Sequence, residues 1–329
     1  MGSFPASTRK LLSSQWTTAI NTTKRFSRRG VLINLPCAEL GIAALKINNP
    51  EKRTAVEMYP GMGVWSTALA CAGFKRVLAI EAMNSLQGPL KQTAALSEGI
   101  IEIVTADPYV WETYSNLKDP SWLGEPQEDS WEHVHPDLFY TGTIPATGKG
   151  ELLLAQLYGC IFNRAAMFQF GRVPMAVWCS ATTINKIMAV PGNMSRCKLT
   201  LVAEACTTSE VVLEARTSDF YPQYEYQLLK ITPLSTPVVK APWDTFEYVI
   251  RHLMVAKKQK LSKIIKGLGP GAEIILTRID FDPDTIIGEM TLSQFDAVAL
   301  RFDEWPLKPL DLIEDIYTVE LANRSQKRR

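Results

Sequence analysis

Two carboxylates and a glycine turn follow one another in the first third of the chain, in an order suited to holding a nucleotide-like ligand. Residues 56–63 read Val-Glu-Met-Tyr-Pro-Gly-Met-Gly, and Glu81 and Asp107 follow. Glycines such as Gly61 and Gly63 let backbone N–H groups approach a ligand, because a Cβ would collide with it. Glu81 can accept hydrogen bonds from both hydroxyls of a ribose, and Asp107 from the amino group of an adenine. The order favours an adenosine-containing ligand over the alternative that both carboxylates only cap helices.

The elements that must position these residues alternate between strands and helices. The sequence predicts strands at 53–58, 76–80 and 100–105, and a helix at 66–72 after the glycine turn. Glu81 and Asp107 therefore each follow the end of a strand. This rhythm predicts an α/β fold of the Rossmann-like, doubly wound kind, which binds its ligands at the carboxyl ends of the strands.

The middle of the chain continues the same pattern with one interruption. Residues 112–139 are polar and contain three prolines, which predicts a surface insertion. We expect a long apolar helix at 151–167 and a buried strand at 173–179. Two late antiparallel strands are predicted at 199–205 and 210–215.

The pattern becomes helical after Pro233, Pro237 and Pro242, which mark a linker. Apolar residues recur at helical spacing over 246–253 and 261–268, and further helices are predicted at 292–302 and 310–321. Six basic and no acidic residues lie between 251 and 272, so this segment can neutralise phosphates, although a solvated helix face is the simpler alternative. The candidate phosphate contacts are Arg251, Lys257, Lys258, Lys260, Lys263 and Lys266, and a basic tail adds Arg324, Lys327, Arg328 and Arg329.

Composition restricts the class of protein. The 329 residues are 46% apolar and 21% charged, as in a folded globular chain. No run approaches the roughly 20 apolar residues of a membrane helix. The six cysteines form no C-x-x-C pair and there are only three histidines, so we expect buried thiols and no metal site.

The N-terminal segment differs in charge from the rest of the chain. Residues 1–38 hold six basic and no acidic residues, whereas the remainder carries 29 basic against 34 acidic residues, a net charge of −5. A segment rich in Ser, Thr and Arg and free of acids is typical of mitochondrial targeting sequences. We expect residues 1–30 to be such a targeting segment; a basic arm that touches phosphates is the compatible alternative.

Short motifs between about residues 30 and 320 indicate a family. They are Tyr-Pro-Gly-Met-Gly at 59–63, Asp-Pro-Tyr at 107–109, Trp111, Thr-Tyr-Ser-Asn-Leu at 113–117, Pro-Gly at 191–192, Tyr-Val-Ile-Arg-His-Leu-Met at 248–254 and Glu-Trp-Pro-Leu-Lys-Pro at 304–309. With them the chain resembles the ribosomal RNA adenine N6-dimethyltransferase superfamily. Within it, the chain is most similar to the mitochondrial transcription factor B group, in particular the specificity factors of fungal mitochondrial RNA polymerase. The resemblance implies an S-adenosylmethionine-dependent methyltransferase fold with a small C-terminal helical domain.

The resemblance also implies where the methyl donor would bind. Active members carry a glycine where this chain has Tyr59, whose ring would crowd the donor. Their entry motif, Gln or Asn followed by Phe and Leu, has become Arg-Gly-Val-Leu at 29–32. Donor binding, if it survives, is therefore expected to be weak. The implied S-adenosylmethionine positions are Leu32, Tyr59, Gly61, Gly63, Glu81, Asp107 and Thr143.

The loop that would position the target adenine departs furthest from active members. Their Asn-Leu-Pro-Tyr or -Phe is replaced by Thr143, Ile144, Pro145 and Ala146. The amide that accepts from the adenine amino group and the ring that stacks on the base are both missing. We therefore expect no catalytic residues and no required cofactor, with S-adenosylmethionine binding left possible.

A nucleotide-binding scaffold without its reacting end predicts a protein that binds nucleic acid for another purpose. As the resemblance implies, it would be a monomer that joins the single-subunit mitochondrial RNA polymerase in the matrix and stabilises melted promoter DNA, with its basic tail near the template strand. Two alternatives stay open: an active mitochondrial ribosomal RNA adenine N6-dimethyltransferase that uses S-adenosylmethionine, and a non-catalytic ribosome-assembly factor that binds ribosomal RNA. The expected parts are 1–30 for targeting, 31–235 methyltransferase-like, 236–322 helical and nucleic-acid-binding, and 323–329 as the tail.

Overall fold

The computed structural model describes residues 4–22, 29–124, 128–309 and 312, and the chain forms two compact units. The first comprises Met1–Met188 and Cys206–Thr236, and the second Ala189–Ala205 and Pro237–Arg329. The chain enters the second unit for the second time at Pro237, one residue after the start that was expected at 236. Residues 189–205, which were expected in the methyltransferase-like part, belong instead to the helical unit.

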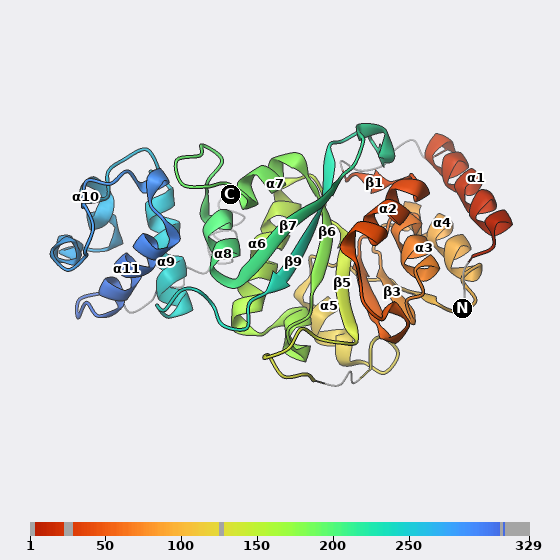
Figure 1. The fold of residues 1–329 in the computed structure, drawn as a ribbon, viewed down its shortest axis with the longest axis horizontal. Coiled ribbons are helices and arrows are strands. Elements are labelled where there is room, and N and C mark those ends of the chain that lie inside the picture. The colour runs from red at the N-terminus through yellow and green to blue at the C-terminus, as the bar shows by residue number, and fades with distance from the viewer. Residues whose placement is uncertain (1–3, 23–28, 125–127, 310–311, 313–329) are drawn as a thin grey trace, which may run out of the picture. The chain divides into compact units, whose positions relative to one another are not determined.

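A seven-stranded sheet forms the centre of the first unit, in the order β4-β3-β2-β5-β6-β9-β7 (Figure 1). The five strands β2 to β6 run parallel, and β9 and β7 are antiparallel. The crossover at β2 places the ends of β2, β3 and β5 side by side, as doubly wound folds require. The strands are β2 (Thr54–Met58), β3 (Arg76–Ile80), β4 (Ile101–Val104), β5 (Leu138–Thr143), β6 (Met175–Ser180), β7 (Thr207–Glu214) and β9 (Tyr226–Pro233), with β1 (Val31–Leu32) paired separately to β8 (Phe220–Tyr221).

Helices follow the strands as the Rossmann-like fold predicts. Side-chain caps start two of them, because Thr147 accepts from the Gly150 N–H and Ser180 from the Thr183 N–H. Within the described residues, no helix is both long and apolar enough to cross a bilayer. The α-helices of this unit are α1 (Ala6–Thr22), α2 (Leu35–Leu45), α3 (Val64–Cys71), α4 (Asn84–Ala95), α5 (Trp111–Ser115), α6 (Gly148–Asn163) and α7 (Ala181–Ile187), with 3₁₀ turns η1 (Pro50–Lys52), η2 (Asn116–Lys118), η3 (Ala166–Phe170) and η4 (Thr217–Asp219).

The core of the first unit is built around a row of aromatic rings. Trp178 on β6 meets the edge of Trp65 at 5.5 Å between ring centroids and lies 5.5 Å from Phe220. Phe220 in turn stacks on Tyr226 at 4.2 Å. The Trp65 indole N–H donates to the Thr141 hydroxyl at 2.8 Å, so its polar atom is satisfied inside the core. These contacts connect α3 with β6, β8 and β9 and hold the carboxyl ends of the strands in place.

Helix α1 occupies much of the segment expected to serve in targeting. Its Leu12 and Trp16 are fully buried. The Trp16 indole N–H is shared between the Met62 carbonyl at 3.0 Å and the Thr93 hydroxyl at 3.2 Å. The helix is therefore an integral part of this unit, and its loss would uncover the glycine turn and α4.

The second unit is a small helical domain. The apolar faces predicted over 246–253 and 261–268 are largely confirmed, because Phe246, Val249, Leu253, Leu261 and Ile265 are buried. The predicted helix at 292–302 is also observed, whereas 313–321 lies outside the described residues. The elements are α8 (Lys198–Cys206), α9 (Trp243–Met254), α10 (Leu261–Ile264), α11 (Leu292–Asp303) and the 3₁₀ turns η5 (Ile265–Leu268), η6 (Ala272–Thr277) and η7 (Ile287–Glu289).

Two predictions of secondary structure were wrong. Residues 199–205 form helix α8 rather than a strand, because Arg196, buried before its first turn, makes a double ion pair with Glu204 near its end at 2.8 and 3.0 Å. Residues 112–139 are not a plain insertion, since they include most of α5 and the start of β5, the central strand that the polar composition concealed.

Candidate functional site

The glycine turn after β2 is shaped by close contacts within the chain itself. Gly61 has φ +64°, and a Cβ there would lie 2.5 Å from Cγ1 of Val31. Gly63 has φ +90°, and its Cβ would lie 2.8 Å from Cγ2 of Thr93. Both positions therefore require glycine, as predicted. The reason at these two positions is the close approach of neighbouring side chains of the same chain.

Glu81, after β3, is fully buried and receives four donors. The Arg29 guanidinium binds it with both terminal nitrogens, Nη1 at 3.1 Å from Oε1 and Nη2 on Oε2. The backbone N–H groups of Gly61 and Met83 add hydrogen bonds at 3.2 and 2.9 Å. A carboxylate offers about four lone-pair positions, so all of the expected ribose-binding capacity of Glu81 is already used.

Asp107 is likewise held by groups of this chain. Its Oδ1 accepts from the Tyr59 hydroxyl at 3.1 Å and from the Tyr109 N–H at 2.9 Å. Tyr59 adopts φ +52°, the left-handed backbone that suits glycine, and the Arg29 guanidinium lies 4.9 Å above its ring. Burial, followed by the nearby Asp107 charge, raises the pKa of the Tyr59 phenol, so it remains a proton donor.

A cavity of about 570 Å³, here called the Glu81 cavity, remains beside these pairs. Three expected donor positions, Tyr59, Glu81 and Asp107, line it. The other four expected positions, Leu32, Gly61, Gly63 and Thr143, are not in its wall. Its lining is Arg29, Tyr59, Glu81, Ala82, Met83, Asp107, Tyr109, Pro145, Thr147, Lys149 and Gly150.

The loop that replaces the catalytic motif turns its first residues into the core. Thr143 is only 4% exposed and Ile144 is 1% exposed. The Ile144 backbone bonds the Trp178 carbonyl at 2.9 Å and accepts from the Tyr226 hydroxyl at 3.1 Å. Pro145 lines the Glu81 cavity, whereas Ala146 faces a different one. The expected catalytic position therefore presents neither an amide nor a ring.

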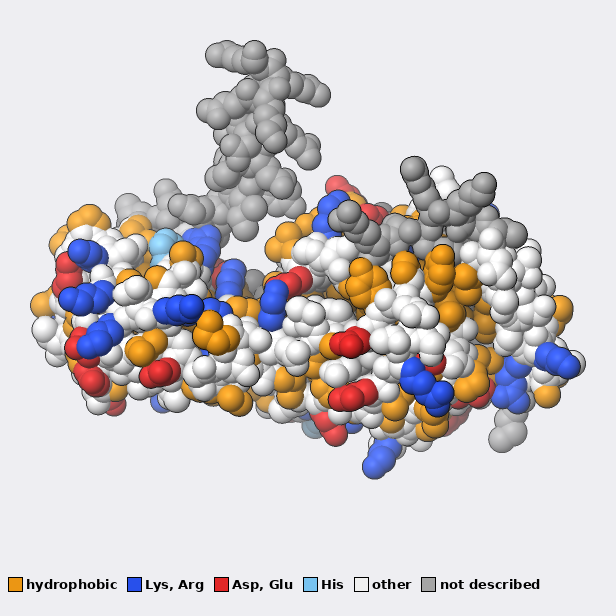
Figure 2. Space-filling view, turned by 90° about the horizontal axis from the view of Figure 1, so that it is seen from above, with side chains coloured by type: hydrophobic (Ala, Val, Ile, Leu, Met, Phe, Trp, Pro, Cys, Tyr) orange, Lys and Arg blue, Asp and Glu red, His pale blue; other side chains and the backbone are white. Residues whose placement is uncertain are grey.

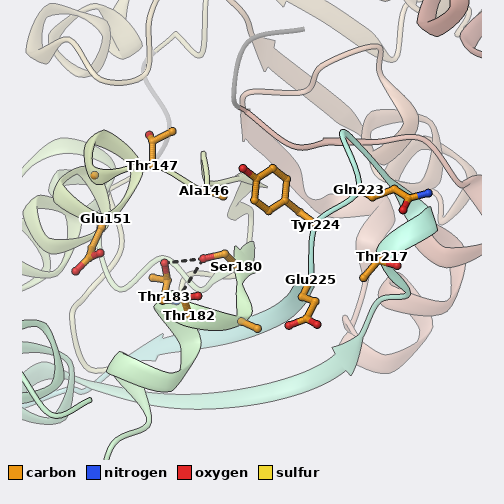
Figure 3. A pocket seen from close by; sticks show the side chains of 12 residues that line it. Ala146, Thr147, Glu151, Ser180, Thr182, Thr183, Thr217, Gln223, Tyr224 and Glu225 are labelled. Carbon is orange, nitrogen blue, oxygen red and sulfur yellow. Dashed lines mark hydrogen bonds between the residues drawn. The ribbon is translucent and has the colours of Figure 1, made fainter. Parts of the chain in front are cut away.

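That second hollow, here called the Tyr224 cavity, measures about 600 Å³ (Figure 3). Hydroxyl groups dominate its wall, and the Ser180 hydroxyl bonds that of Thr183 at 3.0 Å. Glu151 at its edge is held by Lys186 with both oxygens at 2.8 Å. Its lining is Ala146, Thr147, Gly148, Glu151, Ser180, Ala181, Thr182, Thr183, Thr217, Gln223, Tyr224 and Glu225.

Three residues with aromatic or basic side chains, Tyr109, Trp111 and Lys149, were not among the predicted site residues. Trp111 is 55% exposed, and its ring lies 6.1 Å from that of Tyr114. The Lys149 ammonium lies 5.6 Å from the ring centre of Tyr109, and both side chains line the cavity. The signal was in the sequence, because Tyr109 and Trp111 belong to the motif that carried the family resemblance.

Glu57, at the start of the glycine turn, is a buried acid. It has no exposed surface, and the Ser66 hydroxyl donates to its Oε2 at 2.5 Å. Burial, with a further contribution from the Glu81 charge, raises its pKa to about 8 despite the opposing Ser66 bond. Glu57 is therefore protonated at neutral pH and supports the loop without adding charge to the site.

Four of the cysteines are buried and the other two are half-buried. All six lie in the described residues as thiols, and burial raises the pKa of Cys160 and Cys206 to about 12. Across the described part of the chain, no group of three or more His, Cys, Asp or Glu side chains is placed to hold a metal ion.

The basic segment of the second unit does not form one helix. Helix α9 ends at Met254, and the segment continues through a turn and the short α10. Figure 2 shows Lys and Arg side chains on this unit with acidic ones among them. Three of the six bases are engaged: Arg251 donates to the Leu312 carbonyl at 2.9 Å, Lys257 to the Met194 and Arg196 carbonyls, and Lys260 pairs with Asp284 at 2.9 Å.

The remaining bases of this segment, Lys258, Lys263 and Lys266, are exposed, and phosphate binding by them stays a prediction. The basic tail, Arg324, Lys327, Arg328 and Arg329, lies outside the described residues.

Comparisons with known proteins agree on the family. The family model described as ribosomal RNA adenine dimethylase matches residues 39–303. Mitochondrial transcription factor 1 of Saccharomyces cerevisiae is 29% identical over 299 residues, which cover 83% of this chain and 86% of the relative. The mitochondrial dimethyladenosine transferase 1 of Caenorhabditis elegans is 21% identical over 324 residues, covering 96% and 83%.

Solved structures show the same fold. A dimethyladenosine transferase from Plasmodium falciparum superposes with a TM-score of 0.58 at 15% identity, covering 83% of this chain and 98% of that one. The predicted Rossmann-like α/β methyltransferase fold is therefore confirmed.

Proposed function

Because the chain belongs to the ribosomal RNA adenine dimethylase family, we propose that it uses this fold as a mitochondrial transcription initiation factor. It would work in the mitochondrial matrix, bind the single-subunit mitochondrial RNA polymerase and hold promoter DNA open at the start site. Fungal relatives named mitochondrial transcription factor 1 support this proposal over a methylating role.

One observation carries the proposal: the side chains that would position and stack a target base are absent from the loop, whereas a tryptophan and a lysine outside those positions are exposed. Thr143 is buried and Ala146 has no ring, so an adenine would be neither positioned nor stacked for methyl transfer. Trp111, two residues along the chain from Tyr109, is in contrast 55% exposed, and the Tyr109 ring centre lies 5.6 Å from the Lys149 ammonium. Proteins that bind single-stranded nucleic acids with little sequence preference use exposed aromatic rings, on which the bases stack, together with cations that contact the phosphates.

Exchange of Trp111 tests this surface directly. We expect Trp111→Ala to weaken binding of a single-stranded promoter oligonucleotide by about 1–3 kcal/mol, the value of one base-stacking contact. Trp111→Phe keeps a stacking ring and is the matched control, expected to retain most of the affinity. Fluorescence anisotropy measures both. Equal losses in the two variants would show that the ring is not a stacking platform.

The exposed lysines of the second unit provide an independent test. Lys263→Ala combined with Lys266→Ala should lower the slope of log affinity against log salt by roughly 0.7 for each phosphate that is no longer neutralised, since single-strand binding releases condensed counterions. Lys52→Ala, an exposed lysine of the first unit, is the control. An unchanged slope in the double variant would assign these lysines to a solvated face.

The function itself is tested by transcription on linear promoter DNA with the cognate polymerase. We expect the purified chain to confer promoter-specific initiation without added S-adenosylmethionine, and 2-aminopurine placed in the start region to become brighter as strands separate. Failure to stimulate the polymerase, together with methyl incorporation into small-subunit ribosomal RNA, would favour the dimethyltransferase alternative. Failure of both with co-sedimentation on small ribosomal subunits would favour the assembly factor.

A further inference from the structure

The two carboxylates at which a methyl donor is expected to bind are already engaged by side chains of this chain. By the hydrogen-bonding roles expected from the sequence, Glu81 after β3 would hold a ribose and Asp107 after β4 would hold an adenine. Here Arg29 takes the first and Tyr59 takes the second. The two residues also contact each other, since the guanidinium lies 4.9 Å over the phenol ring.

The Arg29–Glu81 pair is the stronger of the two contacts. The Arg29 side chain is 8% exposed and Glu81 is fully buried. Two parallel N–H groups meet two carboxylate oxygens, the geometry in which a guanidinium binds a carboxylate most tightly. A ribose would have to displace this charged, bidentate contact with two neutral hydroxyl groups. It would also leave the buried guanidinium without its counter-ion.

The Tyr59–Asp107 bond closes the adenine end. The Tyr59 hydroxyl lies 3.1 Å from Oδ1 of Asp107, the oxygen to which the Tyr109 N–H also donates. The phenol stays a donor because burial raises its pKa, so the bond persists over the physiological pH range. The Tyr59 backbone is in the left-handed region, which indicates that the surrounding structure holds this ring in place.

We propose that Arg29 and Tyr59 form an internal ligand that occupies the ribose and adenine carboxylates, so that this chain does not bind S-adenosylmethionine although it keeps both carboxylates. The residues therefore do not fit the family's cofactor. The Glu81 cavity persists beside the internal ligand, so the site is blocked at its polar contacts and not by collapse of the space. Removal of the two side chains should recreate a nucleoside site.

The test compares four full-length proteins by isothermal titration calorimetry with S-adenosylhomocysteine, S-adenosylmethionine and adenosine. The wild type and Arg9→Ala, which removes an arginine from an exposed ion pair with Glu39, should show no binding. Arg29→Ala combined with Tyr59→Gly should bind at least about tenfold more tightly than the weakest binding that the titration detects, a difference of about 1.4 kcal/mol. Adding Glu81→Gln to this double variant should remove the gain.

Folding of each protein is checked by circular dichroism and thermal melting. Should the double variant fail to fold, Arg29→Gln replaces it, because it removes the bidentate guanidinium and leaves Glu81 the backbone N–H donors of Gly61 and Met83. A gain in that variant also supports the proposal. Binding by the wild type as tight as by the variants would overturn it, as would folded variants that bind no better than the wild type. Neither result depends on the polymerase, so the proposed role in transcription stands or fails separately.

Discussion

Replacement of the buried Glu57 by glutamine should change how stability depends on pH. Glu57 is protonated in the folded protein, with a pKa of about 8 against 4.5 for the ordinary side chain. Because the folded value is the higher one, the unfolded chain loses the proton first. The stability that this group contributes is complete below about pH 4.5 and falls until about pH 8.

The magnitude follows from the size of the shift. Each pKa unit corresponds to about 1.4 kcal/mol, so the wild type should lose up to about 4 kcal/mol between pH 5 and pH 8 through this group. Glu57→Gln has the same size, cannot ionise and can still accept from Ser66. The variant should therefore lack this part of the pH dependence and overtake the wild type as pH rises.

Scanning calorimetry at a series of pH values measures the difference in melting temperature between the two proteins. Glu112→Gln makes the same side-chain exchange at an exposed position and is the matched control. The expected result is a difference that grows with pH for Glu57→Gln and stays constant for the control. Parallel curves for wild type and Glu57→Gln would refute the assignment of a buried, neutral carboxyl to this position.

Two further predictions concern contacts that the sequence did not reveal. Trp16→Ala should destabilise the first unit by about 3–5 kcal/mol, because it empties a fully buried aromatic site. Chemical denaturation measures this loss, with the exposed Leu11→Ala as the control. A loss below about 1 kcal/mol, as expected of a fraying arm, would contradict the packing of α1. Glu204→Ala should lower the stability of the second unit by about 3 kcal/mol, because Arg196 has no exposed surface and would be left charged without its partner. Adding Arg196→Met to this variant should recover part of the lost stability. Hydrogen exchange of α8 measures both changes. No recovery would mean that the loss does not come from the unpaired charge.

The parts of the site that depend on local pattern could be predicted. Strand β3 was expected at its observed bounds, and the turn at Gly61 and Gly63 follows β2 as predicted. Both signals are short-range, because strand periodicity and positive φ angles are properties of a few consecutive residues. The replacement of the catalytic loop was also legible, since Thr143 and Ala146 differ in chemistry from the residues that methylation needs.

Secondary structure was misjudged where burial overrode local preference. The run at 199–205 contains β-branched residues, which favour strands, yet it is helical in the structure. Near its end lies Glu204, the ion-pair partner of Arg196. Helix α1 was not predicted from the sequence, and Trp16 anchors it to the core through contacts 46 and 77 residues away. The targeting role of residues 1–30 stays a prediction. Neither the Arg196–Glu204 ion pair nor the burial of Trp16 can be predicted from the pattern of the neighbouring residues.

The sequence by itself determined the α/β scaffold, the two carboxylates after their strands and the absence of a base-positioning amide and ring. Only the tertiary structure decided what those carboxylates bind. Arg29 meets Glu81 across 52 residues and Tyr59 meets Asp107 across 48, so their pairing depends on how β1, the glycine turn and the strand ends fold together. Residue type tells which partners a side chain can accept, whereas the fold alone brings one of them within hydrogen-bonding distance.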